Sequence, residues 1–242
     1  MEQWSSRIGF IFAAIGAAVG LGNIWRFPAV VGQNGDGAYL VPYLIAAFAF
    51  AVPLMILEIS VGRSLNADIV AACRQVRSKF EIVGWLIGGS VLAVLRFYLV
   101  ITGWVLAFLL FSMAGTGTSF ESFTGSNQPI LFFVVSTLVV GAIVSLGVQN
   151  GIERMSMVLI PAAFLVLLVL AAYVATLPGF TDGLRFFLTP DTSVLGNHSV
   201  WSAAFGQVFF SFSVGMGVIL TYGSYLGADA NVPRSLATSP LT

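Results

Sequence analysis

The apolar stretch GAAVGLGNIWRFP, residues 16–28, contains three glycines, an asparagine and an arginine. Glycine weakens a helix, because it costs about 1 kcal/mol relative to alanine in a helix interior. A broken helix exposes free N–H groups that suit a carboxylate and free carbonyl groups that suit a cation. With Asn23 and Arg26 beside the glycines, this stretch is expected to hold an amphoteric solute together with a cation.

A second polar interruption lies in the sequence GQVFFSFSVGMGVILTYGSY, residues 206–225, where Ser211, Ser213, Gly215 and Gly217 stand in the middle of an apolar span. Backbone groups without hydrogen-bond partners are tolerated at membrane depth only beside a cavity or a bound ion. Two interrupted helices in one chain therefore point to a mid-membrane binding site for an ion-coupled solute.

The glycines alone have an equally good alternative interpretation. Small residues four apart, as Gly16 and Gly20 are, let membrane helices pack closely. Asn23 and Arg26 favour the binding site, because close packing between helices does not require a carboxamide and a guanidinium group one turn apart.

The composition places the chain in a lipid bilayer. Of its 242 residues, 58% are hydrophobic and 8% are charged, whereas a soluble domain has roughly 25% charged residues. Ten basic and ten acidic residues leave no net charge to attract nucleic acid. The lone Cys73 and the lone His198 exclude an internal disulfide, cysteine-built metal sites and histidine clusters. The sequence has no nucleophile–base pair and no phosphate-binding loop, so we do not expect an enzyme.

The hydropathy pattern predicts an all-α polytopic membrane protein, since each span needs about 20 mostly apolar residues. The six predicted spans are residues 7–31, 38–62, 83–113, 129–148, 156–178 and 200–227. With these spans, most basic residues lie in loops on the same side of the membrane as the N-terminus. Because such loops are usually cytoplasmic, both termini are predicted to be cytoplasmic. The protein is expected to lie in the cell membrane. A short helix along the inner face is expected within residues 63–82, and a folded extracellular cap at residues 179–199.

Five stretches carry a resemblance to a known family. They are WSSRIGFIFAAIGAAVGLGNIWRFP at residues 4–28, QNGDGAYLVPY at 33–43, PLMILEISVGR at 53–63, GIERMSM at 151–157 and GQVFFSFSVGMG at 206–217. In these motifs the chain resembles the neurotransmitter:sodium symporter family, which has the leucine-transporter type of fold. The resemblance covers essentially the whole chain.

The resemblance implies that the first and sixth spans are interrupted at mid-membrane. It divides the chain into a first five-helix repeat at residues 1–178, an extracellular cap at 179–199, the first helix of an inverted second repeat at 200–228 and a cytoplasmic tail at 229–242. Members of the family have about twelve spans. The chain is therefore expected to be a single truncated transmembrane domain that ends where a seventh helix would begin.

The resemblance also implies two sodium sites built from oxygen atoms, which suit a hard cation. The carbonyl groups of Gly16 and Val19 match half of one site, whose other ligands lie on the eighth helix of the family. The Ala18 carbonyl, the Asn23 side chain and Ser211 match the other site, to which a seventh-helix asparagine and the substrate carboxylate also contribute.

An amino-acid site is implied at the same two breaks. The backbone of residues 20–22 and the Tyr98 hydroxyl would hold the substrate carboxylate, although Tyr98 alone would more often be an ordinary packed tyrosine. Met216 stands where several relatives carry phenylalanine, and its flexible thioether adapts to varied shapes, so we expect a bulky apolar or aromatic amino acid. The residues implied at this site are Ala18, Gly20, Leu21, Gly22, Val94, Tyr98, Phe210, Ser211, Ser213 and Met216.

Three further roles follow from the resemblance. Arg26 matches the outer gate, with a snorkelling arginine as its alternative, and Glu58 matches a glutamate that braces the unwound sixth helix. Tyr43, Gln207 and Ser211 match three positions of a chloride site found in chloride-dependent relatives. The position that decides chloride dependence belongs to a seventh helix.

Arg96 departs from the family pattern, because it stands close to Tyr98 where a small or apolar residue is expected. A buried unpaired guanidinium group is expensive in a membrane. We expect Arg96 to reach Glu58 or a free carbonyl, or to face a water-filled cavity. A tolerated change in a chain that is no longer under functional demand is an equal alternative.

Together these features predict sodium-coupled symport of an amino acid or related small zwitterion by alternating access, with chloride as an optional second ion and the lipid bilayer as surroundings. The expected truncation keeps open a non-transporting membrane protein or fragment. A pore built from several copies is disfavoured, because the polar residues form no continuous stripe along a span. The chain alone is expected not to pump unless a second polypeptide supplies the missing helices or two copies complement each other.

Overall fold

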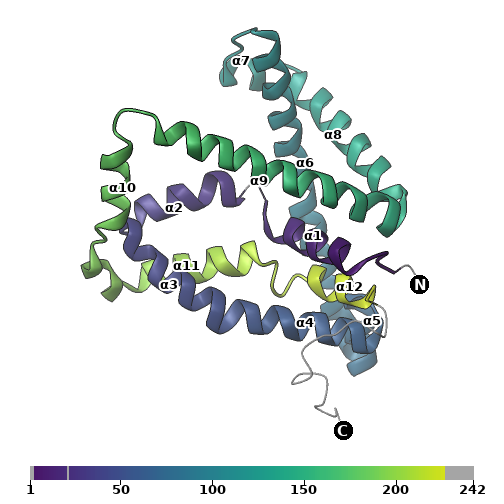
Figure 1. The fold of residues 1–242 in the computed structure, drawn as a ribbon. Helices are drawn as coiled ribbons and strands as arrows, with labels where there is room; N and C mark the ends of the chain where they lie inside the picture. The colour runs from purple at the N-terminus through teal and green to yellow at the C-terminus, as the bar shows by residue number, and fades with distance from the viewer. Residues whose placement is uncertain (1–2, 21, 227–242) are drawn as a thin grey trace.

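The computed structural model describes residues 3–20 and 22–226, which form α-helices, short 3-10 and π-helical turns and no β-strand (Figure 1). The α-helices are α1 (Arg7–Ala18), α2 (Phe27–Gln33), α3 (Leu40–Ile45), α4 (Val52–Leu65), α5 (Ile69–Val76), α6 (Glu81–Ala114), α7 (Phe120–Thr124), α8 (Gln128–Ser145), α9 (Arg154–Ala175), α10 (Phe180–Leu188), α11 (His198–Ser211) and α12 (Val218–Ser224). The shorter turns are η1 (Gly22–Arg26), η2 (Asp36–Tyr39), η3 (Ala46–Ala51), η4 (Ser78–Phe80), η5 (Val148–Glu153) and η6 (Thr192–Gly196). The predicted all-α architecture is confirmed.

Within the described residues, four continuous helical stretches are long and apolar enough to cross a membrane. They are Asp36–Leu65, Ser78–Ala114, Gln128–Ser145 and Val148–Ala175. A fifth candidate consists of two helical pieces, Arg7–Ala18 and Gly22–Gln33, that are bent by 53° relative to each other. The sixth predicted span is divided by residues 212–217 into α11 and α12, neither of which is long enough to cross alone. This division is the interruption that the sequence predicts.

The first break begins where α1 ends. Ser6 caps the start of α1, with its hydroxyl accepting a hydrogen bond from the Gly9 N–H at 2.9 Å. At the other end, Val19 has an extended backbone with φ −97° and ψ 101°, so the chain leaves the helical path there. Helical structure resumes at Gly22 and continues into α2, whose first turn contains a proline.

The second break is set by three residues with left-handed backbone conformations. Their φ angles are 53° for Ser213, 81° for Gly215 and 70° for Gly217. An α-helix needs φ close to −60°, so the helical hydrogen-bond pattern cannot pass through these positions. Glycine takes up this conformation freely because it lacks a Cβ, whereas Ser213 is strained there.

The two halves of the second interrupted helix pack on different partners. α12 packs mainly on α4, while α11 packs on α3 and η3, so α3 and α4 support both sides of the break (Figure 1). α6 and α8 form a hairpin that carries α7 at its tip, and α9 packs beside α1.

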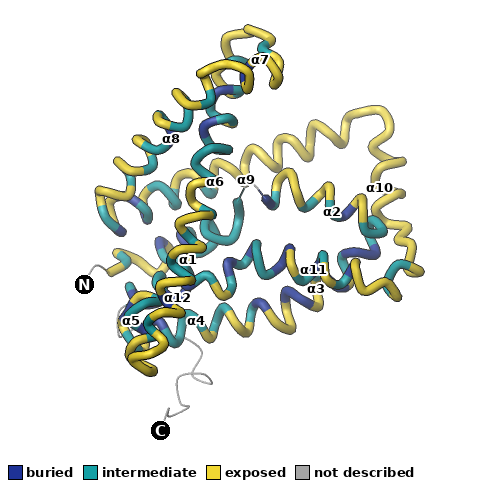
Figure 2. The backbone as a smooth tube through the Cα atoms, turned by 180° about the vertical axis from the view of Figure 1, so that it is seen from behind, coloured by how far each residue is buried: buried dark blue, intermediate teal, exposed yellow. Residues whose placement is uncertain are grey.

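The buried core is small and follows the interrupted helices. One cluster combines Ala46, Ala47 and Ala51 with Val208 of α11, and another joins Ala72 of α5 to α12. By contrast, no residue of α9 is buried, and most of its residues are exposed (Figure 2). Most of its large apolar residues are among the exposed ones. Apolar side chains on the outside of long helices are typical of a membrane protein.

The two shorter segments that the sequence singles out are both structured. The helix expected within residues 63–82 is present as α5, followed by η4. Residues 179–199 contain α10 and η6. The tail predicted at residues 229–242 lies outside the described residues. The repeat boundaries and the sides of the membrane stay predictions.

Candidate substrate and ion site

A cavity of about 420 Å³ lies at the two breaks. The predicted site residues that line it are Gly16, Ala18, Gly20, Gly22, Asn23, Val94, Tyr98, Phe210, Ser211, Ser213 and Met216. They come from α1, η1, α6, α11 and the second break, so the fold brings distant parts of the chain to one place. Val19 directly follows α1 and is not part of the lining. Leu21 lies outside the described residues.

Asn23 joins the two breaks through its side-chain amide. Its Nδ2 donates a hydrogen bond to the Ala18 carbonyl at 2.7 Å, and its Oδ1 accepts one from the Ser211 hydroxyl at 2.6 Å. Gln207 donates in turn from Nε2 to the Ser211 hydroxyl at 3.3 Å. Asn23 therefore contacts both Ala18 and Ser211, the two other residues predicted to bind the same sodium ion.

The second break has two hydrogen bonds of its own to other segments. The Ser213 hydroxyl donates to the Ala17 carbonyl at 3.1 Å, which links the break directly to the end of α1. The Gly215 N–H donates to Glu58 Oε1 at 2.6 Å. A carboxylate of α4 thus accepts a backbone donor that the interrupted helix leaves without a helical partner.

Tyr98 and Phe210 cover the first break from the side of the cavity. A Cβ added at Gly22 would lie 3.8 Å from the Tyr98 hydroxyl and 3.2 Å from Phe210 Cε1, so both aromatic side chains approach the unwound backbone closely. The two rings are stacked, with centroids 6.4 Å apart and an interplanar angle of 18°. A residue with a side chain at position 22 would crowd Phe210.

Sequence reasoning missed six residues of the cavity wall. They are Ala17, Val91, Leu95, Thr102, Val218 and Tyr222. Helical spacing could have identified three of them, because side chains three or four residues from Val94 and Tyr98 share one face of α6. Tyr222 lies beyond the second break and has no comparable signal in the sequence.

The donor atoms at the breaks fit a hard cation. The candidates are the Ala18 carbonyl, Asn23 Oδ1 and the Ser211 hydroxyl, all of them oxygen atoms, which sodium prefers to nitrogen or sulfur. The described residues contain no group of three histidine, cysteine, aspartate or glutamate residues that could hold a metal ion. Of the two residues predicted at the other sodium site, Gly16 lines the cavity and Val19 does not.

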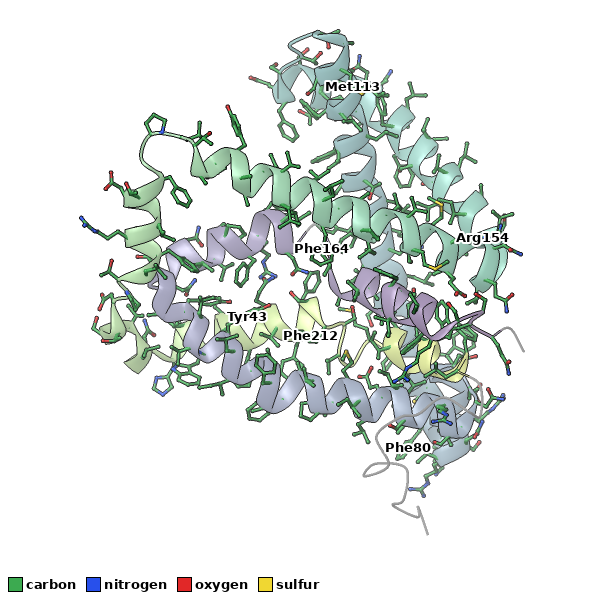
Figure 3. All side chains as sticks on the ribbon, in the orientation of Figure 1. Tyr43, Phe80, Met113, Arg154, Phe164 and Phe212 are labelled. Carbon is green, nitrogen blue, oxygen red and sulfur yellow. The ribbon has the colours of Figure 1, made fainter. Side chains whose placement is uncertain are left out.

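Arg26 and the residues predicted to bind chloride lie close to the same cavity. The Arg26 guanidinium group is 6.0 Å from the centroid of the Phe210 ring, in a cation–π arrangement. Gln207 is buried, and its Oε1 has no hydrogen-bond partner among the described residues. Tyr43 packs with Phe212 on the alanine cluster that faces α11 (Figure 3).

Arg96 does not reach Glu58. Residues two apart on an α-helix point to nearly opposite faces, so Arg96 points away from the cavity that Val94 and Tyr98 line. Its side chain is exposed on α6. Glu58 instead accepts the hydrogen bond from Gly215, and the predicted pairing of Arg96 with Glu58 is therefore wrong.

The N-terminal segment is held by the carboxylate of Glu153, a residue that was not predicted from the sequence. Glu153 is fully buried and accepts hydrogen bonds from the Ser5 N–H at 2.8 Å, the Ser5 hydroxyl at 2.6 Å and the Ser6 hydroxyl at 3.0 Å. Next to it, the Trp4 indole N–H donates to the carbonyl of Tyr222, a residue of the cavity wall, at 3.0 Å. The start of α1 is thus tied to η5 and to α12.

Two interrupted helices around a cavity lined by backbone and hydroxyl groups define the class of membrane proteins with discontinuous helices at a solute site. The model of the sodium:neurotransmitter symporter family matches residues 1–119 and 118–239. The chain belongs to this family.

The chain is similar to several curated proteins. It is 36% identical to an uncharacterized sodium-dependent transporter of Methanocaldococcus jannaschii, over 99% of this chain and 52% of that protein. It is also 36% identical to an uncharacterized sodium-dependent transporter of Bacillus subtilis, over 98% of this chain and 55% of that protein. Its identity to the rat sodium- and chloride-dependent GABA transporter 2 is 28%, over 93% of this chain and 45% of that protein. The chain spans about half the length of these relatives.

A solved structure is similar over nearly the whole chain. The crystal structure of MhsT in complex with L-phenylalanine aligns with a TM-score of 0.85 and 37% identity, and the alignment covers 98% of this chain and 57% of that chain. The leucine-transporter type of fold expected from the sequence is confirmed.

Proposed function

We propose that this chain carries the solute site of a sodium-coupled symporter for an amino acid or a related small zwitterion. The observation that carries the proposal is the cavity of about 420 Å³ at the two breaks, where unwound backbone, hydroxyl groups and apolar side chains meet. A zwitterion needs polar groups at one end and room for its side chain at the other. Alternating access around the cavity would move the solute.

The polar end of the site is proposed to lie at the first break. The backbone N–H groups of Gly20 and Gly22, with the Tyr98 hydroxyl beside them, would hold the substrate carboxylate. Sodium, held by Ala18, Asn23 and Ser211, would supply positive charge next to that carboxylate. The second sodium position is proposed at Gly16 and Val19, and Leu21 belongs to the same stretch of backbone.

The apolar end of the site is proposed to select a bulky apolar or aromatic side chain. Val94, Leu95, Phe210 and Met216 supply apolar wall there, and the flexible Met216 adapts to large side chains. The L-phenylalanine complex of MhsT supports this choice, because that protein is similar over nearly the whole chain.

Further roles are proposed for residues around the cavity. Arg26 would close the outer side above Phe210, and Glu58 would brace the second break. Tyr43, Gln207 and Ser211 would form a chloride site. The division into a repeat at residues 1–178, a cap at 179–199, a further helix at 200–228 and a cytoplasmic tail, with both termini cytoplasmic, belongs to the same proposal.

Binding to the full chain in lipid nanodiscs tests the proposal. Tritiated L-phenylalanine should bind in sodium and not in choline, and unlabelled leucine and tryptophan should compete better than alanine and glycine. Tyr98→Phe should weaken binding about tenfold, because it removes one hydrogen bond to a charged group. Tyr173→Phe is the matched control, since Tyr173 is exposed on α9, away from the cavity.

Two results would contradict the proposal. Equal binding of L-phenylalanine in sodium and in choline would show that binding is not coupled to sodium. Better competition by alanine or glycine than by leucine and tryptophan would show that the site does not prefer bulky side chains. Sodium-dependent uptake by vesicles that contain only these 242 residues would extend the proposal from binding to transport.

A further inference from the structure

The junction between α5 and α6 carries a concentrated set of exposed basic and apolar side chains. We define residues 74–85 as the juxtamembrane segment. Its exposed basic residues are Arg74, Arg77 and Lys79. Its exposed large apolar residues are Val76, Phe80, Ile82, Val83 and Trp85. Leu86, which directly follows the segment, is also exposed. A surface that combines positive charge with exposed aromatic and aliphatic side chains fits the boundary between lipid headgroups and acyl chains.

The two acidic residues nearest in sequence to these basic side chains, Asp68 and Glu81, make hydrogen bonds to other groups. Asp68 uses its carboxylate to accept hydrogen bonds from the N–H groups of Val70 and Ala71, each at 2.9 Å, and so caps α5. Glu81 Oε1 accepts from the Trp85 indole N–H at 3.5 Å. No hydrogen bond or ion pair to the three basic side chains is found among the described residues.

The segment lies at one end of a membrane-length helical stretch. The stretch that contains α6 begins at Ser78, so Arg74, Arg77 and Lys79 lie at or close to its first residue. Side chains at the entry of a span lie at headgroup level, where tryptophan is also common. Trp85 lies two turns into the same stretch, which is consistent with a ring at the interface.

The opposite side of α5 packs against the protein. Ala72 is buried in a cluster with Leu220 of α12, and Ile69 packs against this cluster. A Cβ added at Gly217 would lie 2.7 Å from the Ile69 Cβ, so α5 also touches the end of the second break. The helix therefore lies between the interrupted helix and the surface that bears the basic side chains.

We propose that the juxtamembrane segment is a docking site for the headgroups of anionic phospholipids. Arg74, Arg77 and Lys79 bind headgroup phosphates, and Phe80 and Trp85 insert at the level of the upper acyl chains. Guanidinium and ammonium groups form charge-assisted hydrogen bonds with phosphate oxygens. The bound lipids hold α5 against α12. This role is independent of the solute that occupies the cavity.

Lipid titration of the full chain tests the proposal. The purified chain, stripped of lipid in detergent, is titrated with dioleoylphosphatidylglycerol or with dioleoylphosphatidylcholine, and bound lipids are counted by native mass spectrometry. The unmodified chain should bind the anionic lipid about tenfold more tightly, because each basic residue near a charged headgroup favours binding several-fold. Raising the salt concentration before the measurement should reduce this preference.

Three variants separate the proposed site from general charge effects. Arg74→Gln/Arg77→Gln/Lys79→Gln should bind both lipids equally, whereas Arg74→Lys/Arg77→Lys, which keeps the charges, should retain most of the preference. Arg185→Gln removes an exposed charge from α10 and should leave the preference unchanged. Matching elution volumes in size-exclusion chromatography would establish that the variants are folded.

Several outcomes would overturn the proposal. A triple glutamine variant that keeps the preference would place lipid binding elsewhere. A preference that does not change with salt in the unmodified chain would exclude headgroup charge as its cause, even if the triple variant failed to fold. Displacement of the lipid by soluble glycerol phosphate would indicate a site for small anions and not a lipid-docking surface.

Discussion

The two breaks interrupt their helices by different means. The first break is closed locally, because Asn23 donates to the Ala18 carbonyl five residues earlier. The second break combines left-handed backbone at Ser213, Gly215 and Gly217 with a hydrogen bond from Gly215 to Glu58, which is 157 residues away in sequence. Asn23, which bonds to the first break, is therefore close to it in sequence, whereas Glu58, which bonds to the second break, belongs to a distant segment.

The largest effect is expected from Gly217→Ala in the second break. The new Cβ would lie 2.7 Å from the Ile69 Cβ at a φ of 70°, so strain and overpacking should lower the unfolding free energy by about 3 kcal/mol. Gly215→Ala is the matched control, because its φ is 81° and no atom lies within 4 Å of the added Cβ. Equal losses in unfolding experiments in detergent would exclude the contact with α5 as a cause.

Removal of the distant carboxylate is expected to have the next largest effect. Glu58→Ala deprives the Gly215 N–H of its carboxyl acceptor and should lower the unfolding free energy by about 2 kcal/mol. Glu58→Gln keeps an oxygen acceptor and should lose roughly half as much. The measurement is detergent-micelle unfolding followed by tryptophan fluorescence. If both variants had the same unfolding free energy as the unmodified chain, the carboxylate would contribute nothing to the stability of the second break.

The first break should respond more weakly. Asn23→Ala removes two neutral hydrogen bonds and should lower the unfolding free energy by about 1.5 kcal/mol. A double-mutant cycle with Ser211→Ala should give a coupling of about 1 kcal/mol, because the two side chains are in contact. Additive losses would mean that the hydrogen bond between the breaks contributes nothing to stability.

The smallest effect is expected at Ser213, where two contributions oppose each other. Ser213→Ala removes the hydrogen bond to the Ala17 carbonyl but keeps the left-handed backbone, so the unfolding free energy should fall by about 1 kcal/mol. Ser213→Gly also relieves the strain of that conformation and should be nearly neutral. A larger loss for glycine than for alanine would contradict strain at this position.

The local features of the site were predictable from the sequence. Glycines at 20 and 22, followed by Asn23, break the helical pattern within a few residues, and the structure places all three at the cavity. The second break was predicted in position, because serines and glycines replace apolar residues there. Val94 and Tyr98 were expected only from the family resemblance, and the structure places both at the cavity.

The long-range features were not predictable from residue patterns. The contact between Ser213 and Ala17 joins residues 196 positions apart, and Glu153 binds Ser5 from 148 positions away. A single sequence does not specify such pairs, because many polar residues could serve as either partner. The pairing of Arg96 with Glu58 was wrong for the same reason, since the charge of Arg96 indicated a need for a partner without saying which one. The other interpretations of Arg96 stay predictions.

The hydrogen bonds of Ser211 and Ser213 have a consequence for how the breaks move. Ser211 bonds to Asn23 on one side of the first break, and Ser213 bonds to Ala17 on the other side. The two interrupted helices are therefore connected at two points. If the proposed cation binds Asn23, a rotation of that side chain would change its hydrogen bond to Ser211 of α11. If the cation then raised the affinity for the solute by some factor, the solute would raise the affinity for the cation by the same factor.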